Sequence, residues 1–277
     1  MICQMSRCLS FVVAVSVTAF AAAVEVAPLK HAHSHNDYLH DRPLLDALDH
    51  GFNSVEADIF LVDGKLLIAH VRGDVKPERT LETLYLDPLK KLINENGGSV
   101  FKNGPRFTLL IDIKSKPAPT FAALQEVLAK YANMLTAVEN GKVHEGAITI
   151  VISGERPELD INDKGTRYVG LDGRPADLAS TTPAHFMPMI SDSWSNQFKW
   201  KGDGEMPAAE KAKLTKMVDQ THAAGRVLRF WATPEKEAVW QELRAANVDL
   251  INTDELARLE VFLRMADREK EKAKGAK

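Results

Sequence analysis

Two carboxylates stand two positions apart within a short aliphatic run, at Glu56 and Asp58 in the segment 55–58 (VEAD). In an extended strand, residues at i and i+2 point to the same face. Two unpaired like charges are prohibitive inside a packed sheet, whereas a divalent cation at the edge of the sheet neutralises both. An edge strand with one face in water is the alternative, but the flanking residues are small or aliphatic. The pattern therefore favours Glu56 and Asp58 as metal ligands.

A third carboxylate interrupts another aliphatic run, at Asp112 in the segment 111–114 (IDIK). Lys114 follows two residues later on the same side of the chain, so the two side chains could simply form an ion pair. Because Glu56 and Asp58 already require further oxygen ligands, we favour Asp112 as the third ligand. Oxygen ligands suit Mg²⁺ or Ca²⁺, whereas zinc prefers nitrogen and sulfur. The sequence therefore predicts one divalent cation, Mg²⁺ or Ca²⁺.

Three histidines alternate near the start of the chain, at His31, His33 and His35, and His70 ends a further aliphatic run. Alternate residues of an extended chain point to one side. A histidine-rich stretch can also be an exposed polar segment, and a lone histidine such as His70 is more often structural than catalytic. Together with His35 across a metal ion, His70 would complete an acid/base pair, because imidazole titrates near neutral pH.

The elements that would position these side chains are short aliphatic and β-branched runs separated by helical stretches, which is typical of βα units around a parallel sheet. Eight such runs predict a single-domain (β/α)8 TIM barrel, an α/β fold whose active sites form at the carboxyl ends of the strands. The predicted strands are 29–32, 54–60, 107–113, 147–152, 168–171, 186–190, 227–232 and 250–252.

An extra strand at 65–69 is expected to pair back on 59–62, as a β-hairpin beside the active-site mouth. Asp63-Gly64 between them favours the positive φ angles of a tight turn. Helices are expected where apolar residues recur three or four positions apart, at 42–50, 120–132, 207–224, 235–246 and 255–266.

The N-terminal segment 1–23 has the features of a signal peptide: Arg7, then an apolar stretch, then small residues that favour cleavage after Ala23. The apolar stretch is shorter than the roughly 20 residues that a spanning helix needs. We therefore expect an exported protein, periplasmic or secreted, with no transmembrane segment after cleavage. Both cysteines, Cys3 and Cys8, fall within this segment, which excludes a zinc–thiolate site or a cysteine nucleophile from the mature chain.

The remaining chain is expected to form the barrel over 24–266, followed by a charged, disordered tail at 267–277. The composition is that of an ordinary globular protein, with 277 residues of which 45% are hydrophobic and 26% charged. The net charge of −3 offers no broad basic surface to a polyanion, so we expect no nucleic-acid partner. The chain is expected to be a monomer.

Four segments together resemble the superfamily of phosphatidylinositol phospholipases C and glycerophosphodiester phosphodiesterases. Segment 34–39 (SHNDYL) is similar to the opening of the phospholipase C barrel, and 51–58 (GFNSVEAD) to the superfamily's strand with two metal ligands. Segment 67–70 (LIAH) matches the strand that bears the second catalytic histidine, and 110–114 (LIDIK) the strand of the third carboxylate. The opening HSHNDY is similar to the branch that includes the fungal altered-inheritance-of-mitochondria-six proteins.

The resemblance implies metal-dependent hydrolysis of a small-molecule or lipid-headgroup phosphodiester, such as a glycerophosphodiester. It implies Asn36 as a fourth metal ligand beside Glu56, Asp58 and Asp112, and a catalytic histidine immediately before it. Asn36 follows His35, and this decides between His33 and His35 as the catalytic residue. Lys114 is then expected to bind the phosphate, with His33 and Trp231 as further substrate contacts. The His-Arg-Gly motif of glycerophosphodiesterases is absent, which puts specificity for glycerol in doubt.

Two other functions fit the same residues. A catalytically silent exported binding protein would need the carboxylates but neither His35 nor His70. A metal-dependent enzyme of the amidohydrolase type is suggested by the His-x-His at His33 and His35, since a fold alone does not decide function. The amidohydrolase pattern needs further histidines at the ends of the middle strands, and His144, His185 and His222 lie elsewhere.

Overall fold

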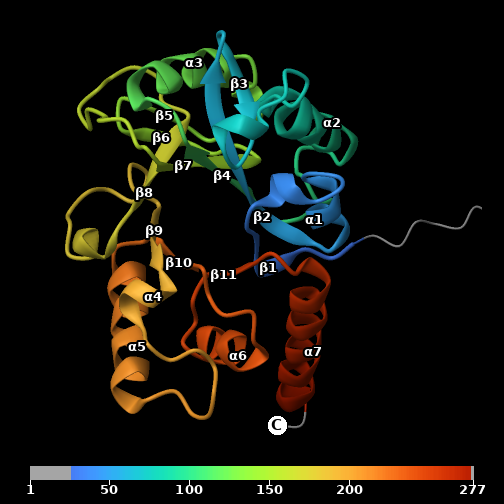
Figure 1. Ribbon diagram of the computed structural model, residues 1–277, viewed down its shortest axis with the longest axis vertical. Coiled ribbons are helices and arrows are strands. Elements are labelled where there is room, and N and C mark those ends of the chain that lie inside the picture. The colour runs from blue at the N-terminus through green and yellow to red at the C-terminus, as the bar shows by residue number, and fades with distance from the viewer. Residues whose placement is uncertain (1–25, 276–277) are drawn as a thin grey trace, which may run out of the picture.

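The computed structural model describes residues 26–275 (Figure 1). The predicted signal peptide, 1–23, lies outside the described residues. No helix within the described part of the chain is both long enough and apolar enough to cross a membrane.

Eight parallel strands form a closed barrel, which confirms the predicted TIM-barrel fold. β1 pairs with β2 on one side and with β11 on the other, and these two pairings close the ring. In order around the barrel the strands are β1 (Leu29–Ser34), β2 (Phe52–Val62), β4 (Phe107–Ile113), β7 (Ile148–Gly154), β8 (Val169–Gly173), β9 (Met189–Ser193), β10 (Val227–Trp231) and β11 (Leu250–Thr253).

The predicted hairpin is also present. β3 (Lys65–Ile68) runs antiparallel to β2, with Val62 opposite Lys65 and Ile59 opposite Ile68. Asp63 and Gly64 both have positive φ angles, 48° and 75°, as a two-residue turn between strands requires. β3 therefore carries the chain back along β2 and delivers His70 to the barrel mouth.

Helices cover the outside of the barrel (Figure 1). They are α1 (Leu45–Asp49), α2 (Asp87–Glu95), α3 (Pro117–Ala129), α4 (Trp194–Gln197), α5 (Ala208–Ala223), α6 (Glu237–Ala245) and α7 (Leu256–Gly275). The sequence did not predict α2, nor the small hairpin of β5 (Ala137–Glu139) and β6 (Lys142–His144). Over the described residues, the connection from β8 to β9 has only one short 3-10 turn, Pro175–Asp177.

Two boundaries differ from the predictions for identifiable reasons. The sixth barrel strand begins at Met189 instead of residue 186, because Phe186 closes a turn on Pro183 and Pro188 has no N–H to donate to a sheet. The tail predicted to be disordered continues α7 as far as Gly275. Its lysines, glutamates and alanines are good helix formers, and Arg244 pairs with Asp267 where the predicted tail begins.

The barrel interior is layered, because alternate residues of each strand face inward. On β4, Leu110 faces inward between Thr108 and Asp112. Leu110 packs with Val151 and Met189 into an apolar layer across the barrel, with Val227 and Leu250 partly buried against it. Polar side chains lie on the carboxyl-end side of this layer, and a cavity lies on the other side. The layer therefore separates the two ends of the barrel.

Candidate active site

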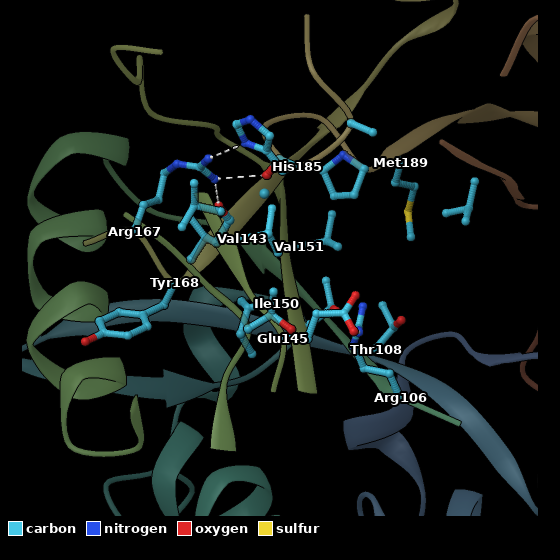
Figure 2. A pocket seen from close by; sticks show the side chains of 18 of the residues that line it. Arg106, Thr108, Val143, Glu145, Ile150, Val151, Arg167, Tyr168, His185 and Met189 are labelled. Carbon is cyan, nitrogen blue, oxygen red and sulfur yellow. Dashed lines mark hydrogen bonds and ion pairs between the residues drawn. The ribbon is translucent and has the colours of Figure 1, made fainter. Parts of the chain in front are cut away.

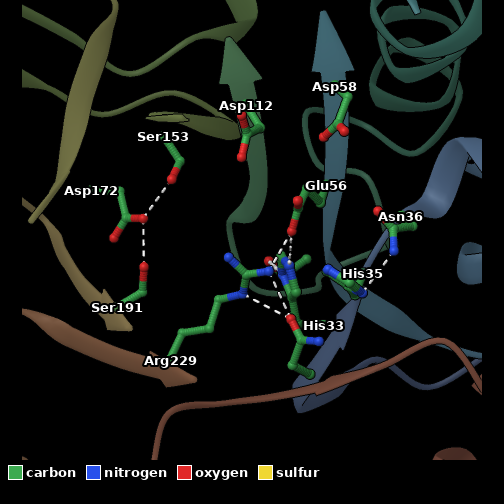
Figure 3. A network of polar contacts seen from close by, with 12 residues as sticks. His33, His35, Asn36, Glu56, Asp58, Asp112, Ser153, Asp172, Ser191 and Arg229 are labelled. Atoms are coloured by element: carbon green, nitrogen blue, oxygen red, sulfur yellow. Dashed lines mark hydrogen bonds and ion pairs between the residues drawn. The ribbon is translucent and has the colours of Figure 1, made fainter. Parts of the chain in front are cut away.

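The three predicted carboxylate ligands converge at the carboxyl ends of β2 and β4 (Figure 3). Asp58 lies opposite Asp112 in the strand register, and Glu56 is two residues before Asp58 on the same face of β2. One oxygen from each of the three carboxylates lies within 4.8 Å of the others. The alternation of the strands thus brings together the residues that the sequence grouped.

Lys114 bridges two of these carboxylates. Its Nζ atom is 3.2 Å from Asp58 Oδ2 and 3.2 Å from Asp112 Oδ1. Burial and the charge of Glu56 raise the pKa of Asp58 to about 6, although Lys114 opposes this. Burial also raises the pKa of Asp112. Asp58 and Asp112 therefore share the single positive charge of Lys114.

Glu56 has a counter-charge of its own, which the sequence did not reveal. Arg229 on β10 is almost fully buried and its guanidinium contacts Glu56 directly. The same guanidinium donates to Asn252 Oδ1, from Nε at 2.9 Å and from a terminal nitrogen at 2.7 Å. Burial alone would raise the pKa of Glu56, but Arg229 and His33 outweigh it and hold that pKa well below its usual range. Glu56 is therefore ionised at neutral pH.

The donor set fits a hard divalent cation. Asp58 Oδ1 is buried and has no hydrogen-bond partner among the described residues. Ca²⁺ binds oxygens at about 2.3–2.6 Å, so two ligands of one ion lie at most about 5 Å apart, and Mg²⁺ requires a tighter set. The spacing of the three carboxylates meets this limit. Asp58 Oδ1 is therefore available as a ligand for a cation.

His35 and Asn36 follow β1 at the same end of the barrel. His35 Nδ1 is 2.8 Å from Asp254 Oδ1, just after β11, and the ring is partly exposed. A carboxylate at this distance favours the tautomer that carries its proton on Nδ1, which leaves Nε2 free to accept a proton. Asn36 adopts a left-handed backbone conformation with φ of 46°, and its amide nitrogen donates at 3.4 Å to the same Asp254 oxygen that faces His35.

Tyr38 connects Asn36, Asp58 and His70. Its buried hydroxyl lies 2.7 Å from Asn36 Oδ1, 2.7 Å from Asp58 Oδ2 and 2.9 Å from His70 Nδ1. Burial and the charge of Asp58 raise the pKa of Tyr38, so the hydroxyl keeps its proton. Contacts through Asn36 and Tyr38 thus link His35 to His70. Sequence analysis predicted no role for Tyr38 beyond its place in a motif.

His70 is more accessible than His35, with 54% of its side chain exposed against 20%. Its Nδ1 faces Tyr38 and lies 3.4 Å from Asp58 Oδ2. An Nδ1–H that donates to Tyr38 leaves Nε2 as the atom available for exchange with a bound molecule.

His33 does not reach the mouth. Its side chain is fully buried, with Nδ1 at 2.7 Å from Ser54 Oγ and Nε2 at 3.6 Å from Glu56. Burial, together with the charge of Arg229, lowers the pKa of His33 to about 3, so the ring is neutral. At this depth it is not placed for the predicted contact with substrate. It packs beneath Glu56, where it helps to hold that carboxylate.

A second polar wall faces the carboxylates across the barrel (Figure 3). Ser153 on β7 and Ser191 on β9 both donate to the buried carboxylate of Asp172 on β8. Arg174 pairs with Asp172 at 2.7 Å and lies over the ring of Trp231. Trp231 lies at the end of β10 with Arg174 stacked on it, and its predicted contact with substrate stays a prediction.

Gly154 permits the close approach of Asp112 to the next strand. Its φ angle is +70°, and a Cβ atom at this position would lie 2.0 Å from Asp112 Oδ1. Any other residue would therefore displace a predicted metal ligand.

A model of the AIM6-like phosphodiesterase domain matches residues 21–170, more than half of the chain. The chain belongs to this family. A model of the glycerophosphoryl diester phosphodiesterase family also matches, over residues 227–257. The AIM6-like segment contains every predicted metal ligand, both histidines that were predicted to be catalytic, and Lys114. The second match covers Arg229, Trp231 and Asp254.

Curated relatives carry the same family name. Altered inheritance of mitochondria protein 6 from Lachancea thermotolerans is 31% identical over 84% of this chain and 65% of its own length. The homolog from Arthroderma benhamiae is 28% identical over 81% of each chain. The crystal structure of a glycerophosphodiester phosphodiesterase from Parabacteroides distasonis is similar with a TM-score of 0.50 and 12% identity, over 87% of this chain and all of that one. This AIM6-like chain thus shares the fold of that enzyme.

Proposed function

We propose that this AIM6-like chain is a metal-dependent phosphodiester hydrolase with a histidine acid/base pair. One arrangement carries the proposal: three carboxylates on neighbouring strands lie within reach of one ion, beside two histidines that Asn36 and Tyr38 link. A binding protein would need the carboxylates but would have no use for an exposed His70 held at Nδ1.

The ion would be held by Asn36, Glu56, Asp58 and Asp112, and it would be Mg²⁺ or Ca²⁺ because all four side chains offer oxygen. When bound, such a cation neutralises a phosphodiester oxygen and favours ionisation of the attacking water or hydroxyl. These ligands come from β1, β2 and β4, so they are held in place by the barrel itself.

The two histidines divide the proton transfers. Asp254 holds His35 at Nδ1, so Nε2 acts as the general base that takes a proton from the nucleophile. Tyr38 faces His70 at Nδ1, so Nε2 of the protonated ring acts as the general acid that gives a proton to the leaving alkoxide. Each transfer contributes on the order of 10²- to 10⁴-fold.

The charges around the mouth favour a monoanionic substrate. Arg229 neutralises Glu56 and Arg174 neutralises Asp172, whereas Asp58 and Asp112 share Lys114. Asp58, Asp112 and Lys114 together carry one net negative charge. A bound divalent cation would change this to one net positive charge, which a phosphodiester monoanion would neutralise. Lys114 then binds a phosphate oxygen as a compact point charge.

The substrate class we infer is a glycerophosphodiester or a phospholipid-headgroup diester. The fold similarity to a glycerophosphodiester phosphodiesterase and the match at 227–257 support a phosphodiester of this kind. Trp231 and Arg174 would contact the alcohol portion, because Arg174 pairs with Asp172 of the second polar wall and lies over Trp231.

The experiment is a hydrolysis assay on bis(4-nitrophenyl) phosphate and glycerophosphodiesters, with and without EDTA. We expect turnover only with added Mg²⁺ or Ca²⁺. Asp58→Ala should abolish both turnover and cation binding by calorimetry, whereas His70→Ala should abolish turnover and spare cation binding. Activity that survives exhaustive chelation would contradict the proposal. Cation binding without hydrolysis of any diester would favour a binding protein.

We further propose that the chain is exported to the periplasm or secreted after cleavage at Ala23, and that it acts as a monomer without a nucleic-acid partner. The apolar segment before Ala23 and the net charge of −3 support these proposals. Mass spectrometry of the protein secreted or released from the periplasm tests the cleavage site, and light scattering tests the monomer.

A further inference from the structure

A second hollow lies at the end of the barrel opposite the candidate active site (Figure 2). It has a volume of about 460 Å³, within the range of small-molecule sites. Its walls are the first residues of β4, β7, β8, β9 and β10, together with the β5–β6 hairpin. The apolar layer of Leu110, Val151 and Met189 separates this cavity from the carboxylates.

The cavity lies where two neighbouring strands barely pair. β8 and β9 are in register only at Asp172–Met189 and Gly173–Ile190, near the carboxyl end of β8. Towards the amino ends the two strands are joined instead through the loop before β9, where Leu171 N donates to Phe186 O at 2.8 Å. The opening between them is lined mainly by aliphatic side chains, including Val138, Ile150, Val169 and Val227.

One charged group in this wall has no opposite charge beside it. Arg167 donates to the carbonyl oxygens of Val169 and His185, and its other terminal nitrogen lies 3.3 Å from His185 Nδ1. No carboxylate among residues 26–275 lies within ion-pair distance of Arg167. Burial lowers the pKa of Arg167, and the charge of Asp163, which lies farther away, partly opposes this. Burial and the charge of Arg167 also lower the pKa of His185, so that ring is neutral.

The other arginine of the cavity is already neutralised. Arg106 pairs with Glu145 at 2.7 Å and donates from Nε to Gly146 O at 3.1 Å. The lining therefore combines aliphatic side chains and three threonines with one guanidinium that has no ion-pair partner among the described residues. Such a lining disfavours a multiply charged nucleotide or sugar phosphate, and it complements a molecule with one negative charge and a hydrocarbon body.

We propose that this cavity is a binding site for an amphipathic organic monoanion, a medium-chain carboxylate, whose head group pairs with Arg167 and whose chain packs among the aliphatic walls. The guanidinium offers N–H donors in the planar arrangement that matches a carboxylate. The site is independent of the phosphodiesterase proposal, because no residue of the candidate active site lines it.

The test is calorimetric titration of the full chain with octanoate and, as the uncharged match, 1-octanol. Arg167→Gln should weaken octanoate binding at least about tenfold, since it removes a charge-assisted hydrogen bond, and should leave octanol binding unchanged. Replacing both Arg106 and Glu145 by glutamine is the matched control. It should leave octanoate binding within about twofold, because it removes an ion pair whose charges already cancel.

A third variant keeps the test decisive if Arg167→Gln fails to fold. Thr149→Phe replaces a lining residue by a larger one and leaves Arg167 in the sequence, so it should weaken octanoate and octanol alike. Asp58→Ala should bind octanoate as the unmodified chain does, which separates this site from the active site. The proposal is overturned if octanoate shows no binding at millimolar concentration, or if its affinity is the same in the folded Arg167→Gln and Thr149→Phe variants as in the unmodified chain.

Discussion

Replacing Arg229 by methionine measures how much the buried ion pair between Arg229 and Glu56 contributes to the free energy of unfolding. The side chains of Arg229 and Glu56 are only 3% and 6% exposed, so Arg229→Met leaves a carboxylate buried without its counter-charge. Breaking a buried ion pair from one side costs about 3–5 kcal/mol. In a chain of this size, 1 kcal/mol corresponds to about 2–4 °C in Tm, so we expect Tm to fall by roughly 6–20 °C.

The assay is thermal unfolding followed by circular dichroism in the presence of EDTA. Arg244→Met is the control, because its partner Asp267 is largely exposed, and it should cost no more than about 1 kcal/mol. Arg229→Met with Glu56→Gln should recover part of the loss, since no lone charge remains. Saturating Mg²⁺ or Ca²⁺ should stabilise Arg229→Met more than the unmodified chain, because the cation then supplies the only counter-charge to Glu56.

Two results would refute this reasoning. One is an Arg229→Met variant that unfolds within about 1 kcal/mol of the unmodified chain, which would mean that Glu56 is solvated or protonated. The other is a double variant less stable than Arg229→Met alone, which would show that packing and the bonds to Asn252 outweigh the charge.

Three further variants probe the site and the fold. Gly154→Ala should weaken cation binding by about 10- to 100-fold in calorimetry, because its Cβ displaces Asp112; unchanged affinity would count against Asp112 as a ligand. Tyr38→Phe should lower kcat by about 10- to 100-fold and keep the chain folded, and an unaltered kcat would remove Tyr38 from the mechanism. Burial raises the pKa of Glu260, but hydrogen bonds from His50 and Arg264 outweigh burial and lower it. Ionised Glu260 therefore stabilises the fold above its unfolded pKa, and this stabilisation is lost as pH falls through its folded pKa. Glu260→Gln should therefore show a flatter dependence of Tm on pH below about 5, and an identical dependence would exclude this role.

The sequence predicts the carboxylate cluster because strand alternation and a local aliphatic pattern determine it. Glu56 and Asp58 share a face because side chains alternate along a strand, which the segment 55–58 alone is enough to predict. Asp112 lies beside them because β4 is the next strand of the barrel. The eight-strand barrel and the β2–β3 hairpin follow from the same kind of local signal.

The partners of these residues could not be predicted, because each is a single polar residue far away in the chain. Arg229 lies 173 positions after Glu56, inside a strand that otherwise has only the features of a buried apolar run. Ser153, Asp172 and Ser191 contribute one side chain from each of three strands, and no spacing pattern connects them.

Errors in the predicted elements also have physical causes. Phe186 and Met187 are apolar enough to suggest a strand, but the turn at Pro183 occupies them and delays β9 by three residues. High charge over 267–277 suggested disorder, whereas the same lysines and glutamates extend α7. Burial of His33 could not be foreseen either, since alternation fixes only the side to which a residue points and not its depth in the barrel.

β1 lies between β2 and β11, so the first strand of the barrel is in place only when the last one is. His35 receives both its backbone bond to Thr253 and its carboxylate partner Asp254 from the far end of the chain, 219 positions away. A nascent polypeptide that lacked this end would already hold the carboxylates of β2 and β4, yet His35, the proposed general base, would lack the contacts that orient it. The rate at which turnover recovers during refolding would therefore report when β1 pairs with β11 and closes the barrel. We expect this step to be late, because contacts between residues so distant in sequence form slowly.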